Sequence, residues 1–405
     1  MLPPSRKYDD MDMISKLPLG IIETILCFLP IQEAARTSIL SREWRYRWIT
    51  IPKLAFIEET FQVTYDDELS ILDQIIGGSN ERKVKAKRCK IFNAVYQVLL
   101  MHEGPIHEFT LSMWADNSCV EIDHMLYHLS RKNTLKKLTL DICCGYKLPL
   151  SLFSLSHLTD LSISSCALDH QPTFKGFDSL TYLFLQEIHT TEKTLMHLLS
   201  NCPSLKHLNL GSNCTTIEYS DDYVIADLFK CLPVIEDLCI SFHIILCFQP
   251  DRIPKKLPTA LVHLKYLCME GLSFLHKYGL PFLVLLIKSS PNLKKLKLQK
   301  WRCYMWLIDD SYLDEVEVGS VTLKDYQNIW VEHLNELEIV EFSDGKNALD
   351  FVRLILAKSP VLKKVRIYLD EDGDKDEELQ ILRVLLRSPC ASPVVDIIVR
   401  QVRTS

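Results

Sequence analysis

A short phrase of apolar residues recurs along most of this 405-residue chain. An apolar residue is followed by two variable residues, a second apolar residue, one variable residue and a third apolar residue, as in Leu205-Lys-His-Leu208-Asn-Leu210. Clear copies begin at Leu135, Leu158, Leu180, Leu205, Leu264, Leu293, Leu334 and Leu362, and weaker copies begin at Ile106, Ile235 and Leu313. The alternation that ends each phrase predicts a short strand with one buried face.

The copies follow one another at similar intervals. The middle apolar residues at positions 109, 138, 161, 183, 208, 238, 267 and 296 are separated by 29, 23, 22, 25, 30, 29 and 29 residues. These intervals lie in or near the roughly 20–29 residues of a leucine-rich repeat. Helical stretches such as 192–201 and 223–231 lie between strands, and Pro203, Pro233, Pro291 and Pro360 mark the turns into the next strand. We therefore predict an α/β fold in which strand–helix units stack into a solenoid, a horseshoe, rather than an ordinary α/β domain with leucine-rich strands.

In this solenoid the residues between the apolar positions face outward on the strand side, which is the concave face of a horseshoe. The predicted concave face comprises Lys137, Thr139, Tyr182, Phe184, His207, Asn209, Asp237, Tyr266, Glu270, Lys295, Lys297, Gln299, Glu336, Glu338, Lys364 and Arg366. Exposed aromatic residues are enriched at binding hot spots. The candidate residues for binding a target are therefore Tyr182, Phe184, His207, Asn209, Tyr266, Glu270 and Lys297. The alternative interpretation is a solvated face, or aromatic residues covered by a loop.

Residues 13–49 do not follow the repeat. Their first predicted helix carries an apolar stripe formed by Ile21, Ile22, Ile25, Leu26 and Leu29. Pro30 ends this helix, residues 31–40 predict a second one, and Ser41 is the predicted cap of a third helix that carries Trp44 and Trp48. Three short helices are too small to form much core alone. Their apolar side chains pack on the solenoid, or they form a docking face for another chain.

This N-terminal segment resembles an F-box of the plant type. The residues that carry the resemblance are Asp12-Met-Ile-Ser-Lys-Leu17-Pro18, Ile25-Leu26-Cys-Phe-Leu29-Pro30 and Ala34-Ala-Arg-Thr37-Ser38-Ile-Leu40-Ser41-Arg42-Glu-Trp44. The segment departs from the usual F-box pattern at Leu19, where an acidic residue is usual, and at Glu43, where a basic residue is usual.

The whole chain resembles the plant F-box/LRR/FBD family. Residues 98–111 are similar to the opening repeat of that family, and residues 329–399 resemble its C-terminal FBD region. The predicted domains are an F-box at 10–55, a helical linker into the solenoid at 56–104, degenerate leucine-rich repeats at 105–328 and FBD-like C-terminal repeats at 329–405.

The resemblance implies a substrate-recognition subunit of an SCF-type (cullin–RING) ubiquitin ligase. The F-box would bind a Skp-type adaptor and, through it, a cullin, while the repeats would hold an unknown target protein. Carried over by position, the adaptor-binding residues are Leu17, Pro18, Ile22, Ile25, Leu26, Leu29, Leu40 and Trp44. The resemblance implies no cofactor and no catalytic chemistry. The alternative is a non-catalytic protein-binding scaffold that does not assemble into a ligase.

Composition excludes several other classes of function. The chain has 12 glycines, and they are placed so that none of the patterns GxGxxG, GxxxxGK or GxSxG occurs, which excludes the common phosphate-loop and nucleophile-elbow enzymes. A net charge of −6 argues against a general affinity for nucleic acid. Asp9, Asp10 and Asp12 stand where a signal peptide needs its apolar core, and no apolar run approaches the roughly 20 residues that span a bilayer. We expect a protein without a membrane segment that works in the cytoplasm and/or the nucleus.

Four further patterns have a structural interpretation beside a functional one. The 14 cysteines show no zinc-type spacing, so we interpret them as reduced core residues and predict no metal site. His124 and His128 lack a third ligand, and the acidic run 370–378 reads as a surface loop rather than a calcium loop. The basic run Arg82–Lys90 is a nuclear signal or an anion-binding patch, or else the solvated face of a helix whose buried residues are Ile91, Phe92, Val95 and Leu99.

Overall fold

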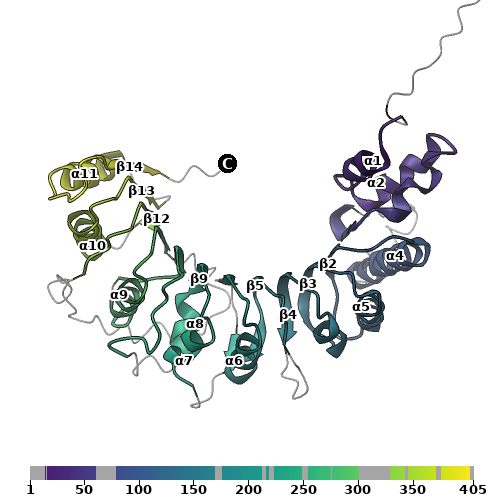
Figure 1. The fold of residues 1–405 in the computed structure, drawn as a ribbon, viewed down its shortest axis with the longest axis horizontal. Coiled ribbons are helices and arrows are strands. Elements are labelled where there is room, and N and C mark those ends of the chain that lie inside the picture. The colour runs from purple at the N-terminus through teal and green to yellow at the C-terminus, as the bar shows by residue number, and fades with distance from the viewer. Residues whose placement is uncertain are drawn as a thin grey trace, which may run out of the picture. The chain divides into compact units, whose positions relative to one another are not determined.

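The computed structural model describes residues 14, 16–60, 79–168, 176–211, 216–218, 223–248, 254–274, 276–300, 329–342, 345–370 and 375–401. The chain forms two compact units, residues 1–144 and 145–405, whose elements are labelled in Figure 1. The weak repeat copy that begins at Leu313 lies outside the described residues, as does most of the acidic stretch before α11. In the part of the chain that is described, no helix is both long and apolar enough to cross a membrane.

The first unit begins with the helices α1 (Leu19–Leu26) and α2 (Ile31–Arg36), followed by the 3-10 helices η1 (Thr37–Ile39) and η2 (Trp44–Thr50). Pro18 and Pro30 occupy the positions before α1 and α2. The hydroxyl of Ser41 accepts a hydrogen bond from the backbone N–H of Trp44 at 3.3 Å, as expected of a cap. The third helical segment differs from the expected α-helix because it is a 3-10 helix. Its seven residues include three aromatic ones, which favour α-helix weakly, and short 3-10 helices are common in such connections.

The rest of the first unit consists of β1 (Lys53–Ile57), η3 (Glu58–Thr60), α4 (Ser79–Met101), β2 (Glu108–Trp114), α5 (Val120–Lys132) and β3 (Lys137–Lys147). The three strands are parallel and pair in chain order. The strand β1 was not predicted, although Ile51, Leu54 and Phe56 repeat the spacing of the phrase and are all buried. In α4, the predicted inward residues Ile91, Phe92, Val95 and Leu99 are buried.

The second unit is a parallel sheet with helices on one side (Figure 1). Its strands pair in the order β4 (Asp160–Leu168), β5 (Tyr182–Gln186), β7 (His207–Leu210), β9 (Asp237–Ser241), β10 (Tyr266–Glu270), β11 (Lys295–Gln299), β12 (Glu336–Phe342), β13 (Lys364–Leu369) and β14 (Asp396–Gln401). The short strands β6 (His189–Thr191) and β8 (Thr216–Glu218) continue from the end of β4. The helices are η4 (Leu150–Ser154), α6 (Glu192–Ser200), α7 (Ile225–Lys230), α8 (Phe242–Cys247), α9 (Gly279–Ser289), α10 (Gly345–Lys358) and α11 (Lys375–Leu386).

The apolar phrase forms the core of both units. In the ten described copies, all three apolar residues are buried, with exposed fractions of 4% or less. Each strand therefore contributes one buried face, and a leucine of one repeat stacks beside the equivalent leucine of the next, as Leu238, Leu267 and Leu296 do. The prediction of an α/β fold built from repeated strands is confirmed.

Candidate protein-binding surfaces

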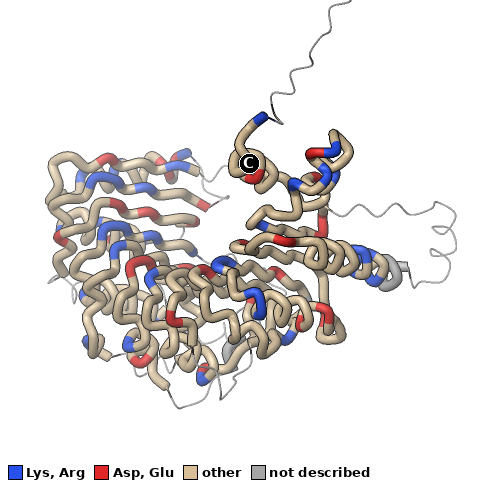
Figure 2. The backbone as a smooth tube through the Cα atoms, turned by 45° about the vertical axis from the view of Figure 1, so that its right-hand side comes forward, with Lys and Arg blue, Asp and Glu red and all other residues tan. Residues whose placement is uncertain are grey.

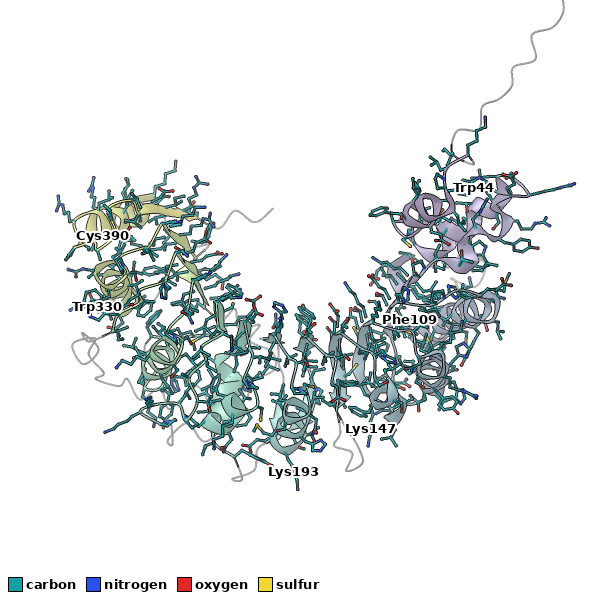
Figure 3. All side chains as sticks on the ribbon, in the orientation of Figure 1. Trp44, Phe109, Lys147, Lys193, Trp330 and Cys390 are labelled. Atoms are coloured by element: carbon teal, nitrogen blue, oxygen red, sulfur yellow. The ribbon has the colours of Figure 1, made fainter. Side chains whose placement is uncertain are left out.

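The N-terminal helices have a small core of their own. Ile22, Leu26 and Trp44 have exposed fractions of 1%, 0% and 6%. The segment η2, which carries Trp44, packs against α1 and α2 (Figure 3). These three residues were predicted to contact a partner or to support that contact, and the structure gives them the supporting position.

Other predicted contact residues of this segment are accessible. Pro18, Ile25, Leu29 and Leu40 are exposed, with exposed fractions of 40%, 39% and 66% for the last three, and Leu17 is half-buried. These side chains are therefore free to bind another chain.

The sequence interpretation missed the most exposed apolar side chains of the segment. Phe28 and Ile39 are 84% and 87% exposed, and the other large exposed members are Ile14, Leu19, Ile21 and Tyr46. Ile21, Ile25 and Phe28 have the spacing of one helical face, opposite the buried Ile22 and Leu26, so the helical periodicity could have identified them. Apolar side chains exposed at this density are typical of a protein–protein interface.

Backbone contacts fasten these helices to the first strands of the sheet. The ring nitrogen Nε2 of His102, at the end of α4, donates a hydrogen bond to the carbonyl oxygen of Ile51 at 2.9 Å. The N–H of Glu103 donates to the carbonyl oxygen of Ile49 at 3.1 Å. At Gly104 the backbones come so close that a Cβ atom would lie 2.8 Å from the carbonyl oxygen of Thr50. Burial lowers the pKa of His102, so this buried ring is neutral near pH 7.

In the second unit, the sheet face opposite the helices carries two rows of side chains, which we call the first and second rows. The first row comprises Asp160, Tyr182, His207, Asp237, Tyr266, Lys295, Glu336 and Lys364. The second row comprises Ser162, Phe184, Asn209, Cys239, Cys268, Lys297, Glu338 and Arg366. All seven residues predicted for target binding lie on this open face and are half-buried.

The part of the open face formed by β5, β7, β9 and β10 is rich in rings. The rings of Tyr182 and His207 are neighbours, with centroids 6.4 Å apart. Nδ1 of His207 lies 2.7 Å from a carboxylate oxygen of Asp237 on the next strand. Burial raises the pKa of Tyr182, and its phenol therefore stays protonated as a hydrogen-bond donor. Phe184 adjoins this group in the second row, so the group combines an apolar surface with polar edges.

The part formed by β11, β12 and β13 is instead a ladder of opposite charges. Nζ of Lys295 lies 3.6 Å from carboxylate oxygens of both Glu336 and Glu338, and Nζ of Lys364 lies 3.7 Å from Glu336. Basic and acidic residues thus alternate from strand to strand, which can be followed in Figure 2. Half-exposed pairs of this kind contribute little stability, but they compensate one another's charge.

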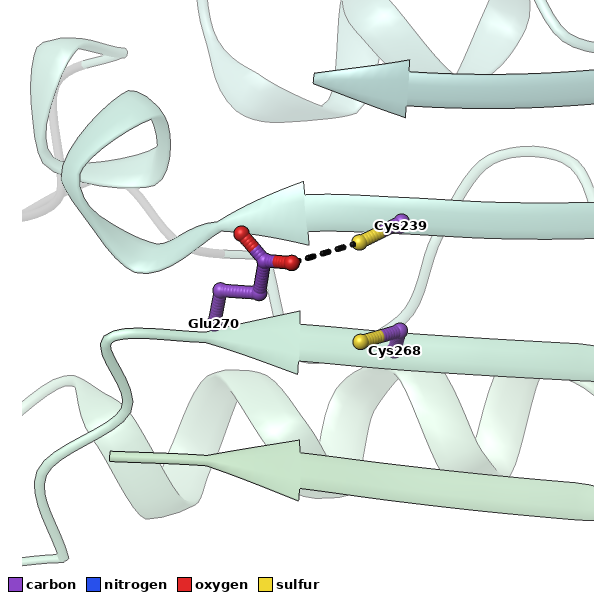
Figure 4. A group of neighbouring side chains, drawn as sticks. All are labelled: Cys239, Cys268 and Glu270. Atoms are coloured by element: carbon purple, nitrogen blue, oxygen red, sulfur yellow. Dashed lines mark hydrogen bonds between the residues drawn. The ribbon is translucent and has the colours of Figure 1, made fainter. Parts of the chain in front are cut away.

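Two cysteines and a glutamate meet on the open face between these two parts. Cys239 and Cys268 are neighbours across β9 and β10, and both are buried, although the side chains beside them in the second row are half-exposed. Sγ of Cys239 lies 3.3 Å from Oε1 of Glu270 (Figure 4). The hydrogen bond to Cys268, burial and the Glu270 carboxylate together raise the pKa of Cys239.

The remaining patterns lie at the surface. His124 and His128 are exposed on α5, and Lys87 and Arg88 of the basic run form ion pairs with Glu58 at 3.5 Å and Asp116 at 3.2 Å. The interpretation of the cysteines as core residues was wrong for Cys89, Cys143 and Cys390, which are exposed.

Comparisons with known proteins match both parts of this architecture. The F-box domain family matches residues 14–53, and the family described as "FBD-associated F-box protein At5g56370, LRR repeats" matches residues 122–221. The F-box/FBD/LRR-repeat protein At1g13570 of Arabidopsis thaliana is 30% identical over 94% of this chain and 97% of its own length. The putative FBD-associated F-box protein At3g50710 of the same plant is 23% identical over 93% of this chain and 98% of its own length. A third relative, the F-box/FBD/LRR-repeat protein At2g04230, is 30% identical over half of this chain and 43% of its own length.

Proposed function

Because this chain belongs to the F-box/FBD/LRR-repeat family, we propose that it is the substrate-recognition subunit of an SCF-type (cullin–RING) ubiquitin ligase. In this role the F-box binds a Skp-type adaptor and, through it, a cullin. The leucine-rich repeats bind a target protein. The domain boundaries of this proposal are those predicted above: 10–55, 56–104, 105–328 and 329–405.

The observation that carries the proposal is the division of the F-box into a buried core and an apolar exterior. Ile22, Leu26 and Trp44 fix the helices, while Phe28 and Ile39 expose nearly their whole side chains. An apolar surface of this kind is stabilised by a partner that covers it. We assign adaptor contact to the exposed side chains, including Pro18, Ile25, Leu29 and Leu40 with the half-buried Leu17, and support to the three buried ones.

The proposed target-binding surface is the ring-rich part of the open face, which becomes the concave face if the repeats curve as a horseshoe. Its residues are Tyr182, Phe184, His207, Asn209, Tyr266, Glu270 and Lys297. Aromatic side chains supply large contact areas at a low entropic cost. The ladder of compensated charges on β11 to β13 offers a target less, because a partner would have to replace ion pairs that already exist.

The proposed mechanism needs no chemistry from this chain. Holding a target beside an activated ubiquitin carrier raises the effective concentration of its lysines. The backbone contacts of His102 and Glu103 favour this role, since they hold the F-box in a fixed position on the first strands. The free cysteines among the described residues are consistent with a reducing compartment, the cytoplasm and/or the nucleus.

A co-purification experiment tests the proposal. The full chain should retain a Skp-type adaptor and a cullin, and Leu40→Ala should weaken both interactions. The matched control is Leu100→Ala, which removes an equally exposed leucine from α4, outside the F-box match. Failure of the wild-type chain to bind the adaptor would refute the proposal. Adaptor binding without a cullin would favour the alternative of a scaffold that joins no ligase.

A further inference from the structure

The open face carries a group of side chains whose donor atoms suit a metal ion. Cys239 and Cys268 occupy equivalent positions on the neighbouring parallel strands β9 and β10. Glu270 lies two residues beyond Cys268 and therefore on the same face of the sheet. The two sulfur atoms and a carboxylate oxygen all lie within 4.8 Å of one another, and Figure 4 shows the three side chains converging across the two strands.

The distances are close to those that a tetrahedral zinc ion requires. Zinc binds cysteine sulfur at about 2.3 Å and carboxylate oxygen at about 2.1 Å, which in a tetrahedron separates two sulfurs by about 3.8 Å and a sulfur from an oxygen by about 3.6 Å. The sulfur of Cys239 and Oε1 of Glu270 lie 3.3 Å apart. Small rotations of the side chains bring the donor atoms to these separations, because the strands that carry them are already neighbours.

The burial of the two cysteines distinguishes them from the rest of the row. Cys239 and Cys268 have exposed fractions of 9% and 3%, although the flanking Asn209 and Lys297 are only half-buried. The thiols thus lie at the bottom of a depression in the row, with a carboxylate above one of them. A site with two sulfur donors selects zinc over magnesium or calcium, which prefer oxygen.

The charges of the site are also balanced. Two thiolates and one carboxylate carry a charge of −3, so a bound divalent cation leaves −1. Lys297 follows Cys268 in the second row and is the register neighbour of that cysteine. Its ammonium group compensates the remaining charge without being a ligand.

We propose that Cys239, Cys268 and Glu270 form a binding site for zinc on the open face of the repeats. Binding releases the proton of each thiol to solvent and forms two Zn–S bonds and one Zn–O bond. Three protein ligands leave a fourth coordination position, which water occupies in the free protein. The proposal does not depend on assembly into a ligase.

Titration of the reduced full-length chain with Zn²⁺, and with Co²⁺ as a coloured substitute, tests the site. The wild-type chain should bind one equivalent, and the Co²⁺ form should show the intense absorption of cobalt bound to thiolate. Cys239→Ala and Cys268→Ala should abolish that absorption. Glu270→Gln keeps both thiols and should weaken affinity at least as much as loss of an outer-shell partner, about 10- to 100-fold.

The control is Cys202→Ala, which removes a buried cysteine distant in sequence from the site and should bind as the wild type does. Thermal unfolding of each variant shows whether the fold is kept, and if either cysteine variant fails to fold, Glu270→Gln decides the result. The proposal is overturned if the wild-type chain takes up no Zn²⁺ at micromolar concentrations. It is equally overturned if Glu270→Gln, or a folded Cys239→Ala or Cys268→Ala, binds as tightly as the wild type.

Discussion

Truncation of the two most exposed apolar side chains of the F-box should separate binding from folding. Phe28 and Ile39 are 84% and 87% exposed, so the folded chain itself buries only a small part of either. Phe28→Ala and Ile39→Ala should therefore lower the free energy of unfolding by no more than about 0.5 kcal/mol, as is usual for surface substitutions.

The effect on adaptor binding should be much larger. Complete burial of a Phe or Ile side chain stabilises a complex by about 1.5–3 kcal/mol, and most of each side chain is available for that burial. We expect each substitution to raise the Kd for a Skp-type adaptor by roughly 5- to 60-fold, and the double substitution to raise it by about 10²- to 10³-fold if the two contributions add.

Trp44→Ala provides the contrast. Trp44 is 6% exposed and packs within the F-box, so its truncation leaves a cavity and should cost about 3–5 kcal/mol of folding free energy. Adaptor binding would then be lost because the module unfolds. Isothermal titration with the purified adaptor and thermal unfolding should be measured on the same samples, with Leu100→Ala as the exposed control on α4.

Two results would refute this reasoning. An unchanged Kd in the double variant would show that the adaptor does not cover Phe28 and Ile39. A fall in Tm as large as that of Trp44→Ala would show that these side chains stabilise the fold and are not a free docking surface.

Three further predictions concern the fold itself. Leu267→Ala, at a fully buried position of the repeat phrase, should lower the free energy of unfolding by about 2–5 kcal/mol in urea denaturation, whereas Leu386→Ala, 68% exposed, should change it little; equal effects would contradict the stacked core. Burial lowers the pKa of His102, so the unfolded chain binds a proton more readily, and stability should fall as the pH drops below about 6.5; His102→Gln should show a smaller loss of stability between pH 7.5 and pH 5.5, and an undiminished loss would assign it to other groups. Gly104→Ala should destabilise the first unit by about 1–3 kcal/mol in thermal unfolding, because its Cβ would lie 2.8 Å from a backbone oxygen, and an unchanged Tm would show that this backbone relaxes freely.

The strands and the core could be predicted from the sequence because the same physical constraint repeats. Each phrase buries three apolar residues on one face, so even weak copies such as the one that begins at Ile235 form strands. The strand β1 was missed because its phrase, Ile51 to Phe56, directly follows the F-box helices and stands far from the next copy. The composition of its residues was sufficient, but its spacing from the neighbouring copy was not.

The roles of individual F-box residues could not be predicted in the same way. An apolar stripe such as Ile21, Ile22, Ile25 and Leu26 shows that a helix has an apolar side, but not which residues face its own core. The structure separates them, since Ile22 and Leu26 are buried while Ile21 and Ile25 are exposed. That separation depends on the position of η2 across the helices, which is a tertiary contact without a local sequence signal.

The cysteine–glutamate group shows why a search for closely spaced ligands fails in a repeat protein. Zinc-binding cysteines are usually sought two to four residues apart, whereas Cys239 and Cys268 are separated by one whole repeat of 29 residues. In a parallel sheet, one repeat along the chain is one strand sideways, a displacement of only about 4.8 Å. Counting residues is not enough, because Lys295 and Glu336 are 41 residues apart and are still register partners. What the paired residues share is their place within the phrase, so aligning the phrases and comparing equivalent positions is the step that brings such side chains together from sequence alone.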